Sequence, residues 1–238
     1  MLWKKTLSPE AVLLLLGGIV LAFFSSSLAA ELLHQAGAAG FKTSVSAGNI
    51  LAATLCFHGT ALVLGFAFLK FQGESLGAAF GLRDPNWKSN LLLAGVVLLA
   101  VLPVMLGLKY ISETAMHKLG WAAQDQDAVK LLHSVKSVWL RVYLGIFAVV
   151  VAPVAEEFFF RGVLFSAAQK MGWPKFGWIG VSLLFALIHH NAPAFVPLFV
   201  FALAQTWLYQ TTDNLLAPVA THSLFNAVNL GLLFLQKT

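Results

Sequence analysis

Charged residues and cysteine are scarce in this sequence. Lys, Arg, Asp and Glu make up 11% of its 238 residues, whereas hydrophobic residues make up 59%. A soluble globular domain is about one-quarter charged, so this composition excludes an ordinary soluble protein and predicts a membrane protein. The one cysteine, Cys56, excludes an internal disulfide, and because it lies in an apolar run we expect a buried side chain.

Basic runs interleaved with aromatic residues are also missing. The net charge of +5 is modest, and the lysines are spread through short loops. Nucleic-acid-binding surfaces need clustered basic side chains, so we expect no nucleic-acid partner. The sequence also lacks internal repeats and low-complexity tracts, which indicates a single domain embedded in the lipid bilayer.

Long apolar runs, by contrast, are abundant. Seven segments have the length or hydropathy of membrane helices, and because two are short an eighth stays open. The fourth can hold one span with an extension, or two helices that meet at Pro153, and we expect Pro153 to mark a break where the helix begins anew. We predict an all-α bundle of about seven to eight transmembrane spans. The segments run from Ala11 to Leu33, Gly48 to Leu69, Leu91 to Ile111, Trp139 to Ala168, Phe176 to His190, Ala194 to Tyr209 and Leu215 to Leu235.

The N-terminus and the charges of the loops indicate how the chain is oriented across the membrane. The charged start, apolar run and small residues are typical of a signal peptide, but the further segments favour an uncleaved first span. The polar loop from Lys109 to Val138 disagrees in lysine count, and its "DAVKLLHSV" stretch predicts an interfacial helix. The other basic residues alternate between loops as expected for a cytoplasmic N-terminus; they are Lys4, Lys5, Arg83, Lys88, Lys170 and Lys175.

Ionisable side chains inside apolar segments occur mainly in the second half of the chain. A carboxylate at bilayer depth is costly, so such residues are candidates for function. The first three segments carry little that is comparable, with His58 in the second and Glu31 at the end of the first. We therefore divide the chain into N-terminal helices with a polar loop (1–138) and a core that carries the chemistry (139–238). The ionisable residues of this core that are candidates for function are Glu156, Glu157, Arg161, His189, His190 and His222.

The stretch "APVAEEFFFRG" holds three of these residues. Glu157 and Arg161 are four residues apart, so on a helix they share a face and can form an ion pair. Glu156 is rotated by about 100° from Glu157. This geometry predicts one glutamate held by arginine and one that faces a cavity, although a purely structural charge network is the alternative.

We expect the other polar residues to lie near the glutamates, because they reach the same depth in the membrane. Glu157 and His189 lie almost equally far from the expected turn at Trp173, so in a helical hairpin they reach the same depth. His222 and Asn226 are four residues apart and share one face of the last span. We expect these groups to reach one cavity. We expect His190 and Asn191, beside the next turn, to cap a helix or to support the site.

Two histidines, a free carboxylate and an amide suit hydrolysis. A carboxylate can take a proton from water, a histidine can orient that water, and N–H donors can stabilise an oxyanion. The same side chains could bind zinc, with Glu156, His189 and His222 as ligands, but the HExxH signature is absent. No Ser or Cys lies in a nucleophile motif, so water is the expected nucleophile.

Three motifs in order resemble a known family. "EEFFFRG", "FALIH" and "HSLFN" match EExxxR, FxxxH and HxxxN. Over residues 144 to 231 the chain resembles the CPBP family, which includes Ras-converting CAAX prenyl endopeptidases and Abi-like membrane proteins. The resemblance implies an intramembrane endopeptidase, often termed a metalloprotease, that cuts CAAX-type or other membrane-associated peptides.

The resemblance also implies roles for individual residues. Glu156 would be the general base on water, and His189 would position that water. His222 and Asn226 would form the oxyanion hole. The supporting residues would be Glu157 and Arg161, which order the site, and Phe185, which packs one turn before His189. A metal-free glutamate mechanism and a zinc mechanism fit these residues equally well.

One departure and two alternatives remain. The family commonly has a glycine where this chain has Ala204, and Gln205 beside it adds a polar group that would re-line the cavity. A non-catalytic protein of the same fold, of the bacteriocin-immunity or scaffold type, is the first alternative. A proton- or metal-coupled transporter is the second, and the lack of inverted repeats argues against it.

Overall fold

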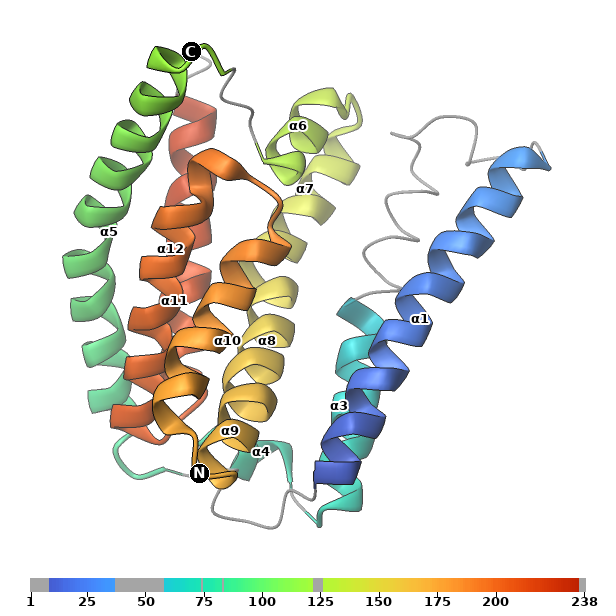
Figure 1. Cartoon of the computed structure of the whole chain (residues 1–238), viewed down its shortest axis with the longest axis vertical. Helices are drawn as coiled ribbons and strands as arrows, with labels where there is room; N and C mark the ends of the chain where they lie inside the picture. Colours follow the sequence, from blue (N-terminus) through green and yellow to red (C-terminus); the bar gives the residue numbers. More distant parts are fainter. Residues whose placement is uncertain (1–8, 37–57, 74, 83, 122–125, 236–238) are drawn as a thin grey trace.

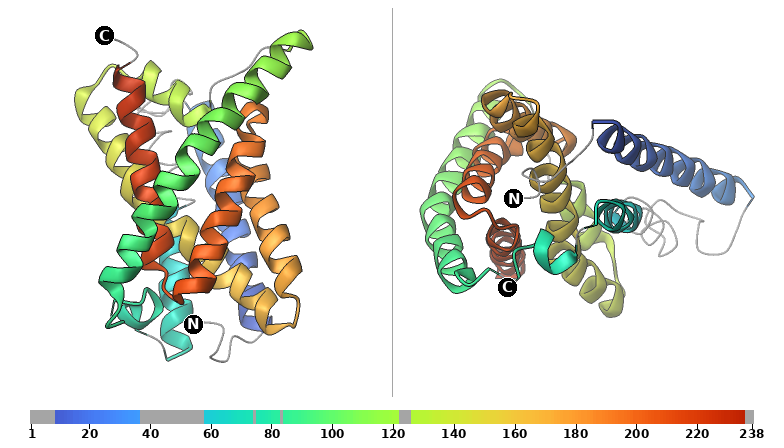
Figure 2. Two further views of the ribbon diagram at one scale, coloured as in Figure 1. Left: turned by 90° about the vertical axis from the view of Figure 1, so that its left-hand side faces the viewer. Right: turned by 90° about the horizontal axis from the view of Figure 1, so that it is seen from below.

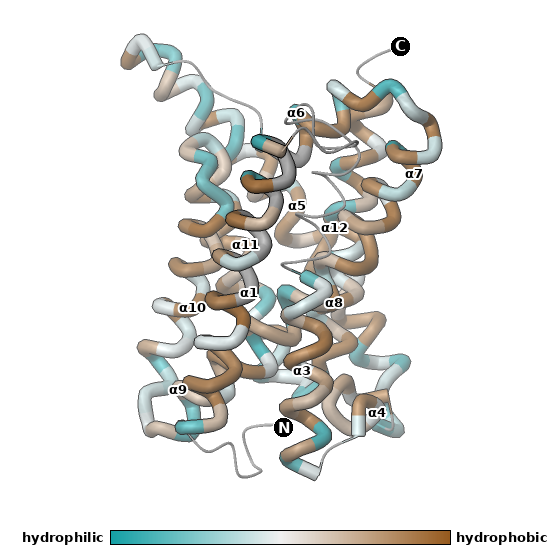
Figure 3. The backbone as a smooth tube through the Cα atoms, turned by 90° about the vertical axis from the view of Figure 1, so that its right-hand side faces the viewer, coloured by the Kyte–Doolittle hydropathy of each residue, from teal (hydrophilic) through white to brown (hydrophobic). Residues whose placement is uncertain are grey.

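The computed structural model describes residues 9–36, 58–73, 75–82, 84–121 and 126–235. Over these ranges the chain is almost entirely helical and has no strand (Figure 1). Four of the described helices are long and apolar enough to cross a membrane, and three apolar helices are shorter. Figure 3 shows hydrophobic residues along most of their length. The predicted all-α membrane bundle is therefore confirmed, while the number of spans stays a prediction.

The bundle consists of one long helix from the middle of the chain and the helices that follow it. The helix α5 (Trp87–Lys118) packs along α11 (Ala192–Thr212) and α12 (Leu216–Leu235), and α10 (Pro174–Ile188) packs on α11 (Figure 2). Between α5 and α10, residues 138–170 form one continuous helix. Its parts are α7 (Val138–Ile146), η3 (Phe147–Val151), α8 (Ala152–Glu157), η4 (Phe158–Phe165) and α9 (Ser166–Lys170).

The predicted break at Pro153 is wrong, because the helix continues through it. Residues Phe147–Val151 and Phe158–Phe165 are π-helical. These two π-helical segments flank α8 directly on either side. A proline ring normally clashes with the carbonyl four residues earlier. The preceding π-helical turn shifts the hydrogen-bond ladder, which lets Pro153 follow it without ending the helix. Short π-helical stretches are frequent at functional sites.

The N-terminal helices stand to one side of the bundle. The helix α1 (Pro9–Gln35) packs on α3 (Thr60–Phe71), and α3 approaches η4 (Figure 2). Gly65 allows this approach, because a Cβ there would lie 2.4 Å from the ring of Phe158. The predicted second segment began at residue 48, and its residues 48–57 lie outside the described part of the chain.

The predicted polar loop is partly helical. The helix α5 continues to Lys118, and the expected helix is present as α6 (Asp127–Ser134), while its place at the membrane interface stays a prediction. The extension of α5 leaves a shorter connection than the sequence predicts.

A polar junction fixes the start of α5 and α12 at the lower end of the bundle in Figure 1. Asn214 donates to the Gly81 carbonyl at 3.1 Å and accepts from the Leu216 N–H at 2.8 Å. Gly81, which follows α4 (Leu76–Ala79), has φ +69°, and a Cβ there would lie 2.4 Å from the Asn214 side chain. Only glycine suits both the backbone and the contact, and the junction sets the depth at which α12 carries its polar residues.

Candidate active site

Glu157 is fully buried and has three polar partners. Its Oε2 lies 3.0 Å from Arg161 Nη1, so the predicted ion pair within one helix is confirmed. Its Oε1 accepts from His222 Nδ1 at 2.8 Å and from Gln205 Nε2 at 3.3 Å. A buried charge is tolerated when it is paired and hydrogen-bonded. Glu157 thus joins α8 to α11 and α12.

Arg161 completes this buried network. Its side chain is fully buried, and Nη2 donates to the Ala202 carbonyl at 3.1 Å. The guanidinium carbon lies 4.9 Å from the centre of the Phe185 ring, within the range of a cation–π contact. Phe185 therefore supports Arg161 in addition to its predicted contact with His189.

Glu156 lies in a different environment from its neighbour. Its side chain is 16% exposed, whereas that of Glu157 is 0% exposed. The Glu156 oxygens lie 3.6 Å from His58 Nε2 and 4.0 Å from His222 Nε2. Within the described residues, Oε2 of Glu156 is buried without a hydrogen-bond donor. Glu156 thus has ionic neighbours but retains an oxygen for a further ligand.

His58 is the neighbour that the sequence did not assign to the site. It directly precedes α3, and its ring packs edge-on against Phe147 at 4.9 Å. The one available signal was an isolated ionisable residue in an apolar segment. Nothing in the motif spacing relates this segment to Glu156.

His222 stands between the two glutamates. Nδ1 donates its hydrogen to Glu157, and Nε2 is on the side of Glu156. The ring packs edge-on against Phe185 and Phe201, with centroids 5.9 and 5.4 Å away. These contacts fix both the orientation of the imidazole and the nitrogen that faces Glu156.

His189 lies at the C-terminal end of α10. Its Nδ1 donates to the Phe185 carbonyl at 2.7 Å, and the two rings are 4.7 Å apart. This bond leaves Nε2 to accept a hydrogen. Around Glu156 the structure brings together His58 and His222, and the place of His189 in this site stays a prediction.

The remaining predicted residues have structural partners. Asn226 donates to the Ala148 carbonyl at 2.8 Å. Asn191 caps α11 by accepting from the Ala194 N–H at 2.9 Å, as expected for a capping residue, whereas His190 is exposed with φ 47°. Gln205 is fully buried and also donates to the Pro218 carbonyl at 2.7 Å, so it supports Glu157.

The predicted zinc ligands do not form a metal cluster in this arrangement. Among the described residues, no three His, Cys, Asp or Glu side chains are placed to hold one ion. The Nδ1 atoms of His222 and His189 bond Glu157 and a backbone carbonyl, which leaves Nε2 of each ring as the nitrogen that could bind an ion. The described geometry does not fit a zinc ion held by Glu156, His189 and His222.

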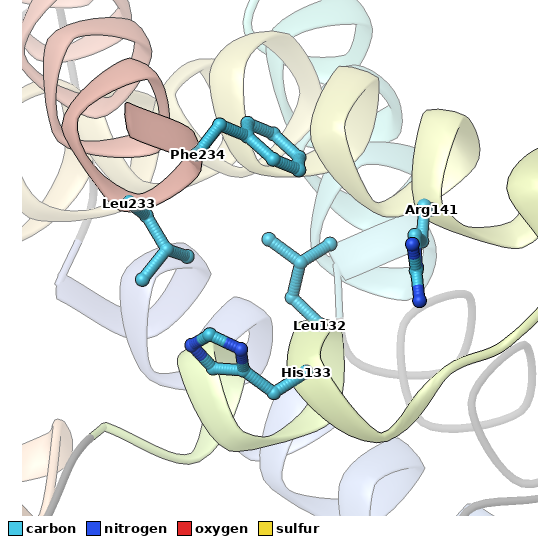
Figure 4. A pocket seen from close by; sticks show the side chains of 5 residues that line it. All are labelled: Leu132, His133, Arg141, Leu233 and Phe234. Atoms are coloured by element: carbon cyan, nitrogen blue, oxygen red, sulfur yellow. The ribbon is translucent and has the colours of Figure 1, made fainter. Parts of the chain in front are cut away.

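A separate pocket lies between α6, α7 and the end of α12 (Figure 4). None of the predicted site residues lines it. Its lining residues are Leu132, His133, Arg141, Leu233 and Phe234.

Comparison with known proteins finds a family match for the part of the chain that carries the motifs. Residues 137–228 match a family model described as Rce1-like, type II CAAX prenyl endopeptidase Rce1-like. No curated protein and no solved structure matches the chain. The matched residues include all three motifs and every predicted site residue, whereas His58 lies outside them.

Proposed function

Because residues 137–228 match the model of a family of type II CAAX prenyl endopeptidases, we propose that the chain is a membrane endopeptidase with Glu156 as general base. The observation that carries this proposal is the contrast between the two glutamates. Glu157 is fully buried and is held by an ion pair with Arg161 and by hydrogen bonds from Arg161, His222 and Gln205, whereas Glu156 is partly exposed and has an oxygen that no donor among the described residues reaches. A general base needs such an oxygen to accept a proton from water.

The proposed reaction uses water and leaves the enzyme unchanged. Glu156 takes a proton as the water oxygen attacks the carbonyl carbon of the peptide, and the carbonyl oxygen becomes an oxyanion. Protonated Glu156 then returns this proton to the departing nitrogen as the C–N bond breaks. The products are a carboxylic acid and an amine, and no covalent enzyme intermediate forms.

The histidines hold the reacting atoms. His189 presents Nε2 and accepts a hydrogen from the water, because its Nδ1 hydrogen is bound to the Phe185 carbonyl. His222 presents Nε2 on the side of Glu156. When that nitrogen carries a proton, it can donate to the oxyanion, and Glu157 stabilises the resulting cation through Nδ1.

The family supports a CAAX peptide as the substrate class to test first. We propose that the substrate reaches the site with one end associated with the membrane, since the helices that carry the site are apolar and exposed on their outer faces. A prenylated peptide and the same peptide without the lipid separate a need for the lipid from a need for the sequence.

Glu156→Gln tests the proposal. We expect peptide cleavage by the purified protein to fall at least about 10²-fold, the usual contribution of a general base, with folding unchanged. Glu113→Gln is the matched control, because Glu113 forms only an exposed ion pair with Lys109. The Glu156→Gln protein also serves to trap bound peptides for identification.

Full cleavage by purified Glu156→Gln would overturn the proposed role of Glu156. If the wild-type protein binds peptides but cleaves none, and Glu156→Gln binds them equally, the non-catalytic alternative of the same fold is favoured.

A further inference from the structure

The carbonyl of Ala148 has no backbone donor, for a reason that lies in the helix itself. In an ordinary α-helix it would accept from the N–H of Ala152. That N–H instead bonds the Phe147 carbonyl, as the π-helical turn requires. The next residue that could reach Ala148 in the π-helical pattern is Pro153, which has no N–H. The π-helical turn and the proline together leave this carbonyl open.

Asn226 supplies the missing hydrogen-bond donor to the Ala148 carbonyl. Its Nδ2 donates to the Ala148 oxygen at 2.8 Å from the facing helix α12. The two residues are far apart in sequence, and both side chains are partly buried. A carbonyl left without a donor in an apolar setting is costly, so this bond ties α12 to the start of the long helix.

The bond lies between the elements that carry the site. Asn226 follows His222 by one helical turn on α12, while Ala148 precedes Glu156 by two turns on the other helix. The distance between His222 Nε2 and Glu156 Oε2 is 4.0 Å. A shift of either helix along the other therefore changes this distance directly.

We propose that Asn226 is a positioning residue whose partner is created by Pro153, and that the two residues act as a pair. The inference rests on the proposed function only where it concerns activity. Because Pro153 has no N–H, the Ala148 carbonyl is left without a backbone donor. Asn226 donates to this carbonyl and so fixes the position of α12 along the long helix. In this arrangement His222, and not Asn226, donates to the oxyanion.

A double-mutant cycle with Pro153→Ala tests this pairing. Alanine supplies an N–H that can bond Ala148, so the asparagine is no longer needed. We expect Asn226→Ala alone to lower the melting temperature by about 2–4 °C, the effect of about one hydrogen bond in a chain of this length. In the Pro153→Ala background, we expect Asn226→Ala to cause less than half of that shift.

Asn229→Ala provides the matched control. Asn229 is on the same helix, but its Nδ2 donates to the Phe225 carbonyl within that helix at 3.0 Å. Its effect on the melting temperature should be the same with proline or alanine at position 153. Cleavage rates measured on the same proteins should show the same rescue of Asn226→Ala by Pro153→Ala.

Each result decides between positioning and direct contact with the substrate. Equal melting shifts for Asn226→Ala in both backgrounds overturn the pairing. Rescued stability without rescued cleavage assigns Asn226 to the oxyanion and overturns the positioning role. If Asn226→Ala alone does not fold, recovery of folded protein in the double variant supports the pairing, and its failure contradicts it. The melting-temperature cycle does not depend on peptidase activity. If the wild-type protein cleaves no peptide, the cycle still tests the pairing, so the proposed function and the pairing can be contradicted independently.

Discussion

At the scale of single residues, adjacent glutamates acquire different properties because a helix separates them by about 100°. Glu157 turns toward Arg161 and His222 and is fully buried, while Glu156 turns toward His58 and stays partly exposed. Sequence spacing could predict the Glu157–Arg161 pair, because one helix fixes both positions. It could not predict the contact of His58, which joins separate helices that no periodicity relates.

His58→Ala tests the importance of that contact. The histidine lies 3.6 Å from Glu156 Oε1 and holds the carboxylate on one side. We expect kcat to fall about tenfold, less than the roughly 10²–10⁴-fold contributed by a general base, with little change in KM. Steady-state kinetics on a fluorogenic peptide measures both values.

His117→Ala is the control for this variant, since His117 is exposed near the end of α5. Wild-type kcat in purified His58→Ala, together with loss of cleavage in Glu156→Gln, would show that His58 has no part in orienting the base.

At the scale of helices, hydropathy located the bundle but not its irregularities. The predicted segments around α10, α11 and α12 agree with the observed helices to within three residues at each end. The expected break at Pro153 is instead a continuous helix with π-helical turns. Proline rules describe an α-helical ladder, and a single sequence does not reveal where a π-helical turn shifts that ladder.

The junction between α5 and α12 has a predicted pH dependence. Asp84 accepts from the Asn86 N–H at 2.8 Å and from Asn214 Nδ2 at 3.3 Å. These bonds, with that from Asn86 the stronger, hold the pKa of Asp84 below its ordinary value. A carboxyl with a lowered folded-state pKa stabilises the protein above its unfolded pKa of about 3.9, and this stability is lost as the pH falls through the folded pKa.

We therefore expect the melting temperature of the wild-type protein to fall more steeply than that of Asp84→Asn between about pH 5 and pH 3. Thermal unfolding in detergent at several pH values measures the difference. Glu113→Gln, in an exposed ion pair, should retain the wild-type slope. Equal slopes for all three proteins would contradict a role for Asp84 in acid sensitivity.

At the scale of the whole molecule, α5 is long and apolar enough to connect the two sides of a membrane. The helix α5 runs from the end that holds the Asn214 junction to the other end, and α10 begins at the first of these (Figure 1). The 32 residues of α5 span about 48 Å, more than the roughly 30 Å of a hydrocarbon core. The sequence could predict this layout from hydropathy, but loop charge alone leaves the orientation as a prediction.

Cysteine labelling tests that orientation. In a Cys56→Ser background, we expect Lys175→Cys to react with an impermeant thiol reagent only from the cytoplasmic side, and Lys118→Cys only from the outside. Both side chains are exposed. Reversed labelling would invert the predicted orientation, and labelling of both from one side would contradict the arrangement of α5 and α10.

The shortness of α10 has a consequence for the surrounding bilayer. Its 15 residues span about 22 Å, less than the roughly 30 Å of hydrocarbon, and its outer face is apolar. Beside α10, the lipid must thin, or headgroups and water must descend to its C-terminal end. That end carries His189, so we expect a surrounding bilayer to bring water to the depth of His189.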